Sequence, residues 1–321
     1  MSCNSDYALP LSVCLTSVFE NLQNKPIKIN AYILSGDLSE ESKEKIGSLA
    51  NIYNQNIFFI NVDPSYFSSA PTLRWTKETY YRLLINELMP KNLDRILYLD
   101  CDIVANKPID DFYEIDLGEF YLGALYEKDN VGPRKRLGLN ANGPYFQTGV
   151  ILLDVKKCNL ILNYENAEKV IQSLGDKLLV VDQDVINVLF DGKIKPIDKK
   201  YNNTEITNFM GRNYNRLFNS IDRKEIEETY IFHYACGKPW NNLFPGSCED
   251  IWYKYLKLSP YKDLYTEKFN SIKYKLLRTG LVKFLFFKYV NFTPMINNMF
   301  HKVLPQGTYA KLKNYYRRHI K

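Results

Sequence analysis

The stretch Arg95-Ile-Leu-Tyr-Leu-Asp-Cys-Asp102 decides the fold, because an apolar run of strand length ends directly in two aspartates. Further runs of strand length lie at 28–35, 57–62, 120–125 and 149–154. Segments 37–53 and 76–88 have the spacing and the end signals of helices. This alternation predicts an α/β fold with helices packed on a mixed, mostly parallel sheet. In such sheets ligands bind beyond the carboxyl ends of the strands, where we expect Asp100 to lie.

The composition is typical of a folded globular chain, with 321 residues of which 45% are apolar and 24% charged. This length suits one large α/β domain with appendages, or two small domains. No apolar run approaches the ~18–20 residues that cross a bilayer. Six cysteines without a paired C-x-x-C spacing argue against a disulfide scaffold or a zinc ribbon. With no signal-peptide pattern at the start, we expect a cytoplasmic protein with reduced thiols.

Charge is distributed unevenly along the chain. Residues 268–321 contain twelve Lys or Arg, no Asp or Glu, and eleven Phe or Tyr. We therefore expect a folded domain over 1–260 and a basic, aromatic, helical region over 261–321. Such a tail suits peripheral binding to an anionic membrane surface. A patch for single-stranded nucleic acid is the disfavoured alternative. Residues 202–225 are polar and irregular, which predicts a surface excursion.

A candidate metal site is carried by Asp100, Asp102 and His233. Two carboxylates one residue apart at a strand end can converge on Mg²⁺ or Mn²⁺, although the motif alone is weak and an Asp turn is the alternative. His233 is the only histidine before the tail, and it is either a ligand for a borderline metal or a hydrogen-bonded core residue. Lys238 could offer a cation to a phosphate, or could be a solvated loop lysine.

Two further features could contact a ligand. Asp182 and Gln183 open a helix, where acidic residues are explained by the helix dipole or by contacts to a sugar. Arg82 is the only charged residue in an otherwise apolar and aromatic run, 80–85. A buried arginine needs an anionic partner, so Arg82 is either structural or a substrate clamp.

Five ordered blocks closely resemble glycosyltransferase family 8, the GT-A fold family of bacterial lipopolysaccharide galactosyl- and glucosyltransferases and of glycogenin. The blocks are Asn4-Ser-Asp-Tyr7, Thr79-Tyr-Tyr-Arg-Leu83, Ile96-Leu-Tyr-Leu-Asp-Cys-Asp102, Tyr145-Phe-Gln-Thr-Gly-Val150, and Asp182-Gln-Asp184 with the late His-Tyr and Lys-Pro-Trp. The resemblance runs from about Cys3 to about Trp252. It implies a single Rossmann-like GT-A domain that transfers a hexose with retention from UDP-glucose or UDP-galactose, using Mn²⁺ or Mg²⁺. The implied acceptor is an oligosaccharide or glycolipid of the cell envelope.

The resemblance also implies roles position by position. Asp100, Asp102 and His233 would hold the metal, and Gln183 and Asp182 would be the catalytic residues. The nucleotide and its phosphates would be bound by Asn4, Asp6, Tyr7, Lys238 and Gly237. The donor sugar or acceptor would be contacted by Arg82, Glu127, Gln147, Thr148, Gly149 and Asp182.

The sequence departs from the family pattern in three places. Gln147-Thr-Gly149 stands where Asn-Ser-Gly or Asn-Ala-Gly is usual, and Glu127 stands where Asp is often found. Family members normally have a full strand before the Asn4 block, whereas only Met1-Ser-Cys3 precede it here. We therefore expect that the start is mis-set or the chain truncated, and that upstream residues complete the sheet.

Retention could proceed through an enzyme carboxylate, with Asp182 the better candidate, or by same-face attack of the acceptor, which we favour. A binding protein of the same fold that has lost turnover is the alternative function. A nucleotidyltransferase is disfavoured, because no Gly-rich phosphate loop lies near the amino end. Together these features place the predicted enzyme in the cytoplasm, peripherally bound to the inner face of the membrane and without a nucleic-acid partner.

Overall fold

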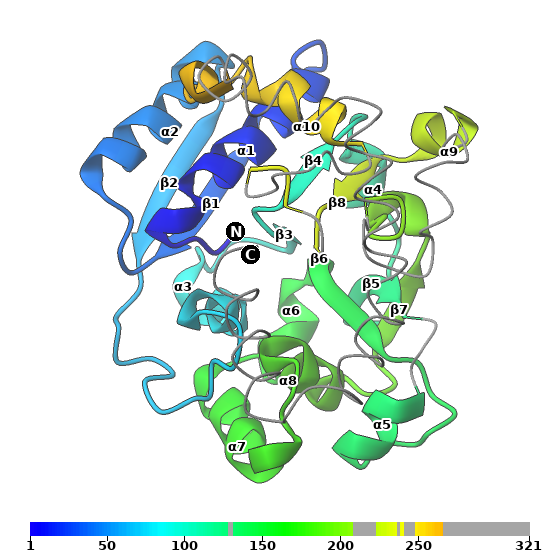
Figure 1. Ribbon diagram of the computed structural model, residues 1–321. Coiled ribbons are helices and arrows are strands. Elements are labelled where there is room, and N and C mark those ends of the chain that lie inside the picture. The colour runs from blue at the N-terminus through cyan, green and yellow to red at the C-terminus, as the bar shows by residue number, and fades with distance from the viewer. Residues whose placement is uncertain (128–130, 208–222, 236–237, 241–247, 266–321) are drawn as a thin grey trace, which may run out of the picture. The chain divides into compact units, whose positions relative to one another are not determined.

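The computed structural model describes residues 1–127, 131–207, 223–235, 238–240 and 248–265 (Figure 1). Most of the predicted basic tail, from residue 266 onward, lies outside these residues, so the boundary near 260 stays a prediction. Within the described part, no helix is both long enough and apolar enough to cross a membrane. The five described cysteines are free thiols.

The described strands form a mixed arrangement. β1 (Asn30–Ser35) and β2 (Asn56–Asn61) pair in parallel. A four-stranded sheet has the order β3 (Arg95–Leu99), β6 (Phe146–Asp154), β5 (Leu122–Tyr126) and β7 (Ile194–Ile197). Within it β5 and β7 are parallel, whereas β6 runs antiparallel to both of its neighbours. The predicted mixed α/β architecture is confirmed.

The first three residues link β1 to the end of β3. Leu34 N donates to Met1 O and Cys3 N donates to Leu34 O, each at 2.9 Å, so the segment runs parallel to β1. On the other side, Cys101 Sγ donates to Ser2 O at 3.0 Å. Met1 to Cys3 therefore lie next to the strand end that carries Asp100 and Asp102.

A short antiparallel pair beside the main sheet brings a distant segment to the same place. β4 (Ile103–Ala105) follows Asp102 directly, and it pairs with β8 (Ile231–His233). In this register Ile103 lies opposite His233. The pairing therefore carries His233 to the turn between β3 and β4.

The helices of the amino-terminal half begin with η1 (Ser5–Tyr7) and α1 (Ala8–Leu22). The predicted helix at 37–53 is α2 (Glu40–Ile52), which Ser39 caps and which buries Ile46 and Leu49. The predicted helix at 76–88 is mostly a 3₁₀ helix, η2 (Lys77–Leu84), continued by α3 (Ile85–Leu88). It buries five consecutive residues, Tyr80 to Leu84.

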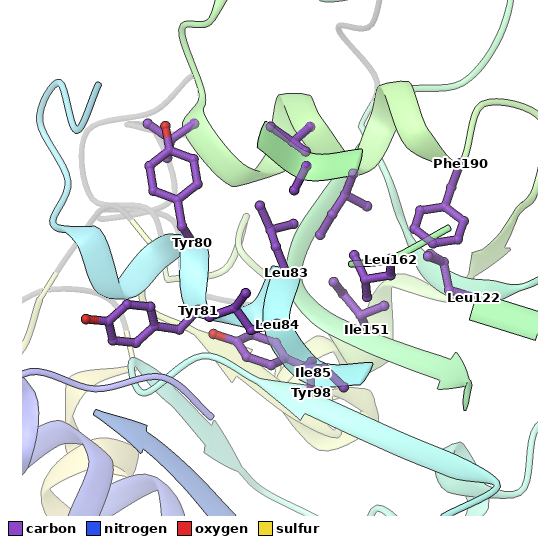
Figure 2. Close-up of a cluster of buried hydrophobic side chains, with 14 of the residues drawn as sticks. Tyr80, Tyr81, Leu83, Leu84, Ile85, Tyr98, Leu122, Ile151, Leu162 and Phe190 are labelled. Carbon is purple, nitrogen blue, oxygen red and sulfur yellow. The ribbon is translucent and has the colours of Figure 1, made fainter. Parts of the chain in front are cut away.

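Figure 2 shows how this helical segment contributes to the main core, with Tyr80, Leu83 and Leu84 in the same cluster as Tyr98 and Ile151. A second cluster lies around α1, which buries twelve of its fifteen residues. The remaining helices are α4 (Asp110–Tyr113), α5 (Val131–Leu137), α6 (Val155–Cys158), α7 (Tyr164–Leu174), η3 (Gly175–Lys177), α8 (Val181–Leu189), η4 (Lys199–Tyr201), α9 (Arg223–Glu228) and α10 (Glu249–Leu256).

Candidate functional site

Asp100, Asp102 and His233 meet at the carboxyl end of β3. His233 Nε2 lies 3.2 Å from Asp102 Oδ1 and 3.9 Å from Asp100 Oδ2. One potential ligand atom from each residue lies within 4.8 Å of the other two. Backbone bonds hold the turn, since Asp100 N donates to Gly149 O at 2.7 Å and Tyr234 N donates to Asp102 O at 2.8 Å. The residues that the sequence predicted as metal ligands are therefore brought together.

Gly149 leaves the room in which these three groups face one another. A Cβ on this residue would stand 2.3 Å from His233 Cε1 and 2.6 Å from Asp100 Oδ2. Both distances are well below van der Waals contact, so a side chain here would displace the imidazole and the carboxylate. The third residue of the Gln-Thr-Gly block is thus required by packing at the candidate metal site.

The residues present fit a divalent cation. Asp102 Oδ1 is buried; among the described residues His233 Nε2 lies 3.2 Å from it, but no hydrogen bond to this oxygen is completed. A buried carboxylate oxygen without a donor is costly unless a cation satisfies it. Two carboxylates with one imidazole suit Mn²⁺ or Mg²⁺.

Lys238 lies on the other side of Asp102. Its Nζ forms an ion pair with Asp102 Oδ2. It also lies 5.9 Å from the ring centre of Tyr7 and 5.7 Å from that of Trp240. Burial alone would raise the pKa of Asp102, but the Lys238 ammonium opposes burial and that pKa lies well below its ordinary value. Asp102 is therefore an anion at neutral pH.

The other predicted nucleotide contacts lie in η1 and its cap. Asn4 Oδ1 accepts a hydrogen bond from Tyr7 N at 3.1 Å, and Asp6 is exposed. The rings of Tyr7 and Trp240 pack edge to face, 5.8 Å apart. Gly237 lies outside the described residues. Tyr7 is thus next to the candidate metal site, on the Lys238 side.

Arg82 joins the metal-site carboxylates to α8. It is 5% exposed; its Nη2 donates to Asp100 Oδ1 at 2.7 Å and its Nε pairs with Asp182 Oδ2 at 2.9 Å. Its Nη1 donates to Thr148 O, and its guanidinium lies 4.5 Å from the ring centre of Tyr98. Arg82 therefore has the anionic partners that its burial demands.

Asp182 and Gln183 begin α8 on the far side of Arg82. Burial raises the pKa of the Asp182 carboxyl to about 6, although Arg82 opposes this shift. Asp182 Oδ2 accepts a bond from Thr148 Oγ1 at 3.2 Å. Gln183 Nε2 donates to Glu127 Oε1 at 3.3 Å, and Gln183 Oε1 accepts from Thr148 N at 3.3 Å. These contacts form one connected network of predicted sugar-site residues: Arg82, Glu127, Thr148, Asp182 and Gln183.

One part of the network that supports α8 was not predicted. The carboxylate of Asp184, which is fully buried, receives two bonds from Arg136, at 2.7 and 2.9 Å, and one from Tyr145 at 2.7 Å. The backbone N–H groups of Leu179 and Val180 also donate to it. Asp184 thus fixes the start of α8, which carries Asp182 and Gln183. The sequence Asp182-Gln-Asp184 did not indicate this role, because acidic residues at the start of a helix are already explained by the helix dipole.

The prediction that 202–225 is a surface excursion is wrong for its first part. Asn202, Asn203 and Thr207 are at most 2% exposed, because this segment pairs alongside β8. His233 N donates to Asn203 O at 3.2 Å, and Asn202 Oδ1 lies 2.8 Å from His233 Nδ1. Polar residues here are satisfied by protein groups, which sequence alone does not reveal. Residues 208–222 lie outside the described part.

Comparison with known proteins identifies the class. The sequence model of glycosyl transferase family 8 matches residues 1–243. A protein of Haemophilus influenzae is 29% identical over 194 residues, which are 59% of this chain and 58% of that protein, so the match spans little more than half of its length. The lipopolysaccharide 1,2-glucosyltransferase of Escherichia coli K12 is 27% identical over 276 residues, 81% of this chain and 77% of that enzyme.

Among solved structures, the galactosyltransferase LgtC, crystallised with donor and acceptor sugar analogues, superposes with a TM-score of 0.68. It is 23% identical, and the match covers 80% of this chain and 94% of that one. The fold and the acidic site thus define a glycosyltransferase of the GT-A class. The chain belongs to glycosyltransferase family 8.

Proposed function

We propose that the chain is a retaining hexosyltransferase that moves glucose or galactose from a UDP-sugar to a saccharide acceptor of a cell-envelope or lipid-linked glycan. The observation that carries the proposal is the convergence of Asp100, Asp102 and His233 around Gly149, beside Lys238 and the network of Arg82, Asp182 and Gln183. Family membership supports the transfer reaction, and the relatives named above include a glucosyltransferase and a galactosyltransferase.

In this proposal Asp100, Asp102 and His233 hold Mn²⁺, or Mg²⁺ in its place. When bound, the cation acts as a Lewis acid that stabilises the charge on the departing diphosphate. Lys238, seated between Asp102 and the rings of Tyr7 and Trp240, presents a second positive charge to a phosphate oxygen. Asn4, Asp6 and Tyr7 contact the nucleoside.

The donor sugar lies against the network on the other side. Gln183 and Glu127 present amide and carboxylate groups to its hydroxyls, and Arg82 keeps Asp100 and Asp182 at a fixed separation. Rigid hydrogen-bonded side chains of this kind orient a substrate without losing further conformational entropy during the reaction.

We favour same-face attack by the acceptor as the route to retention. Asp182 is 3% exposed, and its Oδ2 is engaged by both Arg82 and Thr148. To act as a nucleophile it would have to leave both partners. A covalent sugar adduct on Asp182, detected by mass spectrometry of the intact protein during turnover, would overturn this preference.

The test is UDP release from UDP-glucose and UDP-galactose with Mn²⁺, with and without saccharide acceptors extracted from bacterial membranes. Asp102→Asn should lower the rate at least ~100-fold, because it removes a charged ligand. Asp154→Asn is the matched control. Asp154 lies at the end of β6 away from Gln147. Its side chain accepts a hydrogen bond from Lys157 N, and the amide oxygen of asparagine can accept the same bond.

Equal rates in Asp102→Asn and the wild type would refute the assigned site. If UDP-sugars bind but no UDP is released with any acceptor, the chain is instead a binding protein of the same fold.

We further propose that region 261–321 binds the enzyme peripherally to the inner face of the membrane. Its basic and aromatic composition supports binding to anionic headgroups. The full chain should sediment with anionic vesicles and not with neutral ones. Unchanged sedimentation after removal of 268–321 would contradict the proposal.

A further inference from the structure

Two side-chain amides connect the backbone at Gly149 to the imidazole of His233. Gly149 N donates to Gln147 Oε1 at 2.9 Å, and Asn202 Nδ2 donates to the same oxygen. Asn202 Oδ1 then lies 2.8 Å from His233 Nδ1. Asn202 is completely buried and His233 is 1% exposed, so both ends of this contact lie inside the protein.

The direction of each hydrogen bond in this chain of groups follows from one backbone group. A backbone N–H can only donate, so the atom of Gln147 that faces Gly149 N is the oxygen. An amide oxygen can only accept, so Asn202 turns its NH₂ group to Gln147 and its own oxygen to His233. Nδ1 of His233 therefore carries a hydrogen.

A hydrogen on Nδ1 decides the state of the other ring nitrogen of His233, Nε2. In a neutral imidazole with hydrogen on Nδ1, Nε2 has a free lone pair. That nitrogen is the one that lies 3.2 Å from Asp102 Oδ1 and 3.9 Å from Asp100 Oδ2. A lone pair that faces two carboxylates is suited to share a cation with them.

We propose that Asn202 and Gln147 are positioning residues that hold His233 in the Nδ1–H tautomer, with Nε2 directed at the metal. The inference rests on the metal site of the proposed function. A ligating histidine whose second nitrogen is hydrogen-bonded keeps its ring orientation and tautomer, and loss of such a partner typically costs 10–100-fold in metal affinity.

Gln147 then has a structural role in addition to its predicted contact with the sugar. Its oxygen receives the bonds from Gly149 N and from Asn202 Nδ2 at the same time. An asparagine at this position would be one methylene shorter and would withdraw that oxygen by about 1.5 Å. Glutamine at this position therefore fits the support of His233 through Asn202.

The test compares two neighbouring buried asparagines. Mn²⁺ binding to the full chain is measured without substrate, from the electron paramagnetic resonance signal of free Mn²⁺. Asn202→Ala should weaken Mn²⁺ binding at least ~10-fold. Asn203→Ala is the matched control, because Asn203 is equally buried but its side chain bonds Thr229 and Ile206 N.

Asn202→Asp should recover only part of the affinity lost in Asn202→Ala, because its carboxylate still accepts the hydrogen bond from Nδ1 but places its second oxygen against Gln147 Oε1, which can only accept. A general loss of folding would weaken binding in both alanine variants. Wild-type affinity in Asn202→Ala, or equal losses in both alanine variants, would overturn the proposal.

A second measurement needs no bound metal. In a ¹H–¹⁵N correlation spectrum of the imidazoles of the metal-free wild type, His233 should carry its hydrogen on Nδ1. Comparison with His233→Gln assigns its signals among the three histidines. Hydrogen on Nε2 alone would overturn the inference. Absence of Mn²⁺ binding in the wild type would instead refute the metal site of the proposed function, while the spectrum would still decide the tautomer.

Discussion

Replacing Gly149 by alanine should separate the three groups of the candidate metal site. The new Cβ would stand 2.3 Å from His233 Cε1, 2.6 Å from Asp100 Oδ2 and 3.0 Å from Gln147 Nε2. Since ordinary contact begins near 3.4 Å, the imidazole must retreat by about 1 Å. The backbone at Gly149 lacks a positive φ, so the perturbation is one of side-chain space and not of backbone strain.

Two effects of different size follow from this displacement. Overpacking in a dense interior costs about 1–3 kcal/mol in the free energy of unfolding. A displacement of about 1 Å at a ligand is far more damaging to the site, and we expect Mn²⁺ affinity and the rate of UDP release each to fall at least ~100-fold.

Gly123→Ala provides the matched control, because Gly123 lies in the neighbouring strand β5 of the same sheet. Its Cβ would meet Ile197 Cγ2 at 3.1 Å and Leu117 Cδ2 at 3.2 Å, which are ends of apolar side chains away from the site. Urea denaturation should show a comparable or smaller loss of stability in this variant, with Mn²⁺ binding unchanged. A Gly149→Ala protein that binds Mn²⁺ as tightly as the wild type would refute the placement of the site.

Three further predictions follow from the buried charges. Arg82→Met should leave Asp100 and Asp182 without their shared cation and lower the free energy of unfolding by about 3–5 kcal/mol in urea denaturation; an unchanged stability would show that Arg82 does not connect them. Asp184→Asn should lose its bidentate pair with Arg136 and slow UDP release at least ~10-fold, with Mn²⁺ affinity within about twofold of the wild type; parallel losses in rate and affinity would contradict this. Burial raises the pKa of Asp182 to about 6, so its carboxyl contributes stability that is fully present below its ordinary pKa of 3.8 and is lost as the pH rises through 6. Urea denaturation across this pH range should show a fall in the free energy of unfolding that Asp182→Asn removes. An identical fall in the variant would assign it to another group.

The sequence predicted the parts of the fold whose signals are local. The apolar run before Asp100 and the i,i+3,i+4 spacing of α2 each indicate an element without reference to the rest of the chain. The convergence of Asp100 and Asp102 with His233, more than a hundred residues later, came from the scarcity of histidine and from the resemblance to the family. Local spacing could not have given it, because it depends on the pairing of β4 with β8.

Elements buried on all sides were missed. α1 buries twelve of its fifteen residues, including Ser12, Thr16 and Ser17, so no polar face marks its period. Asn202 falls in a segment predicted to lie at the surface because that segment is polar and irregular. Its burial is explained by two tertiary partners, Gln147 and His233, and neither lies near it in the sequence. A buried amide is predictable only once the groups that satisfy it are known.

The charges of the site bear on the order in which its ligands bind. Asp100, Asp102 and Asp182 lie close together, and the described cations among them are Arg82 and Lys238. Arg82 is shared by two of the carboxylates and Lys238 is paired with the third, so without a metal ion the three carboxylates outnumber these two cations. The same carboxylates attract a divalent cation. A nucleoside diphosphate that entered first would be repelled by them, because like charges in a partly buried site are weakly screened. We therefore expect the cation to bind first, which turns an acidic site into one that can hold a diphosphate.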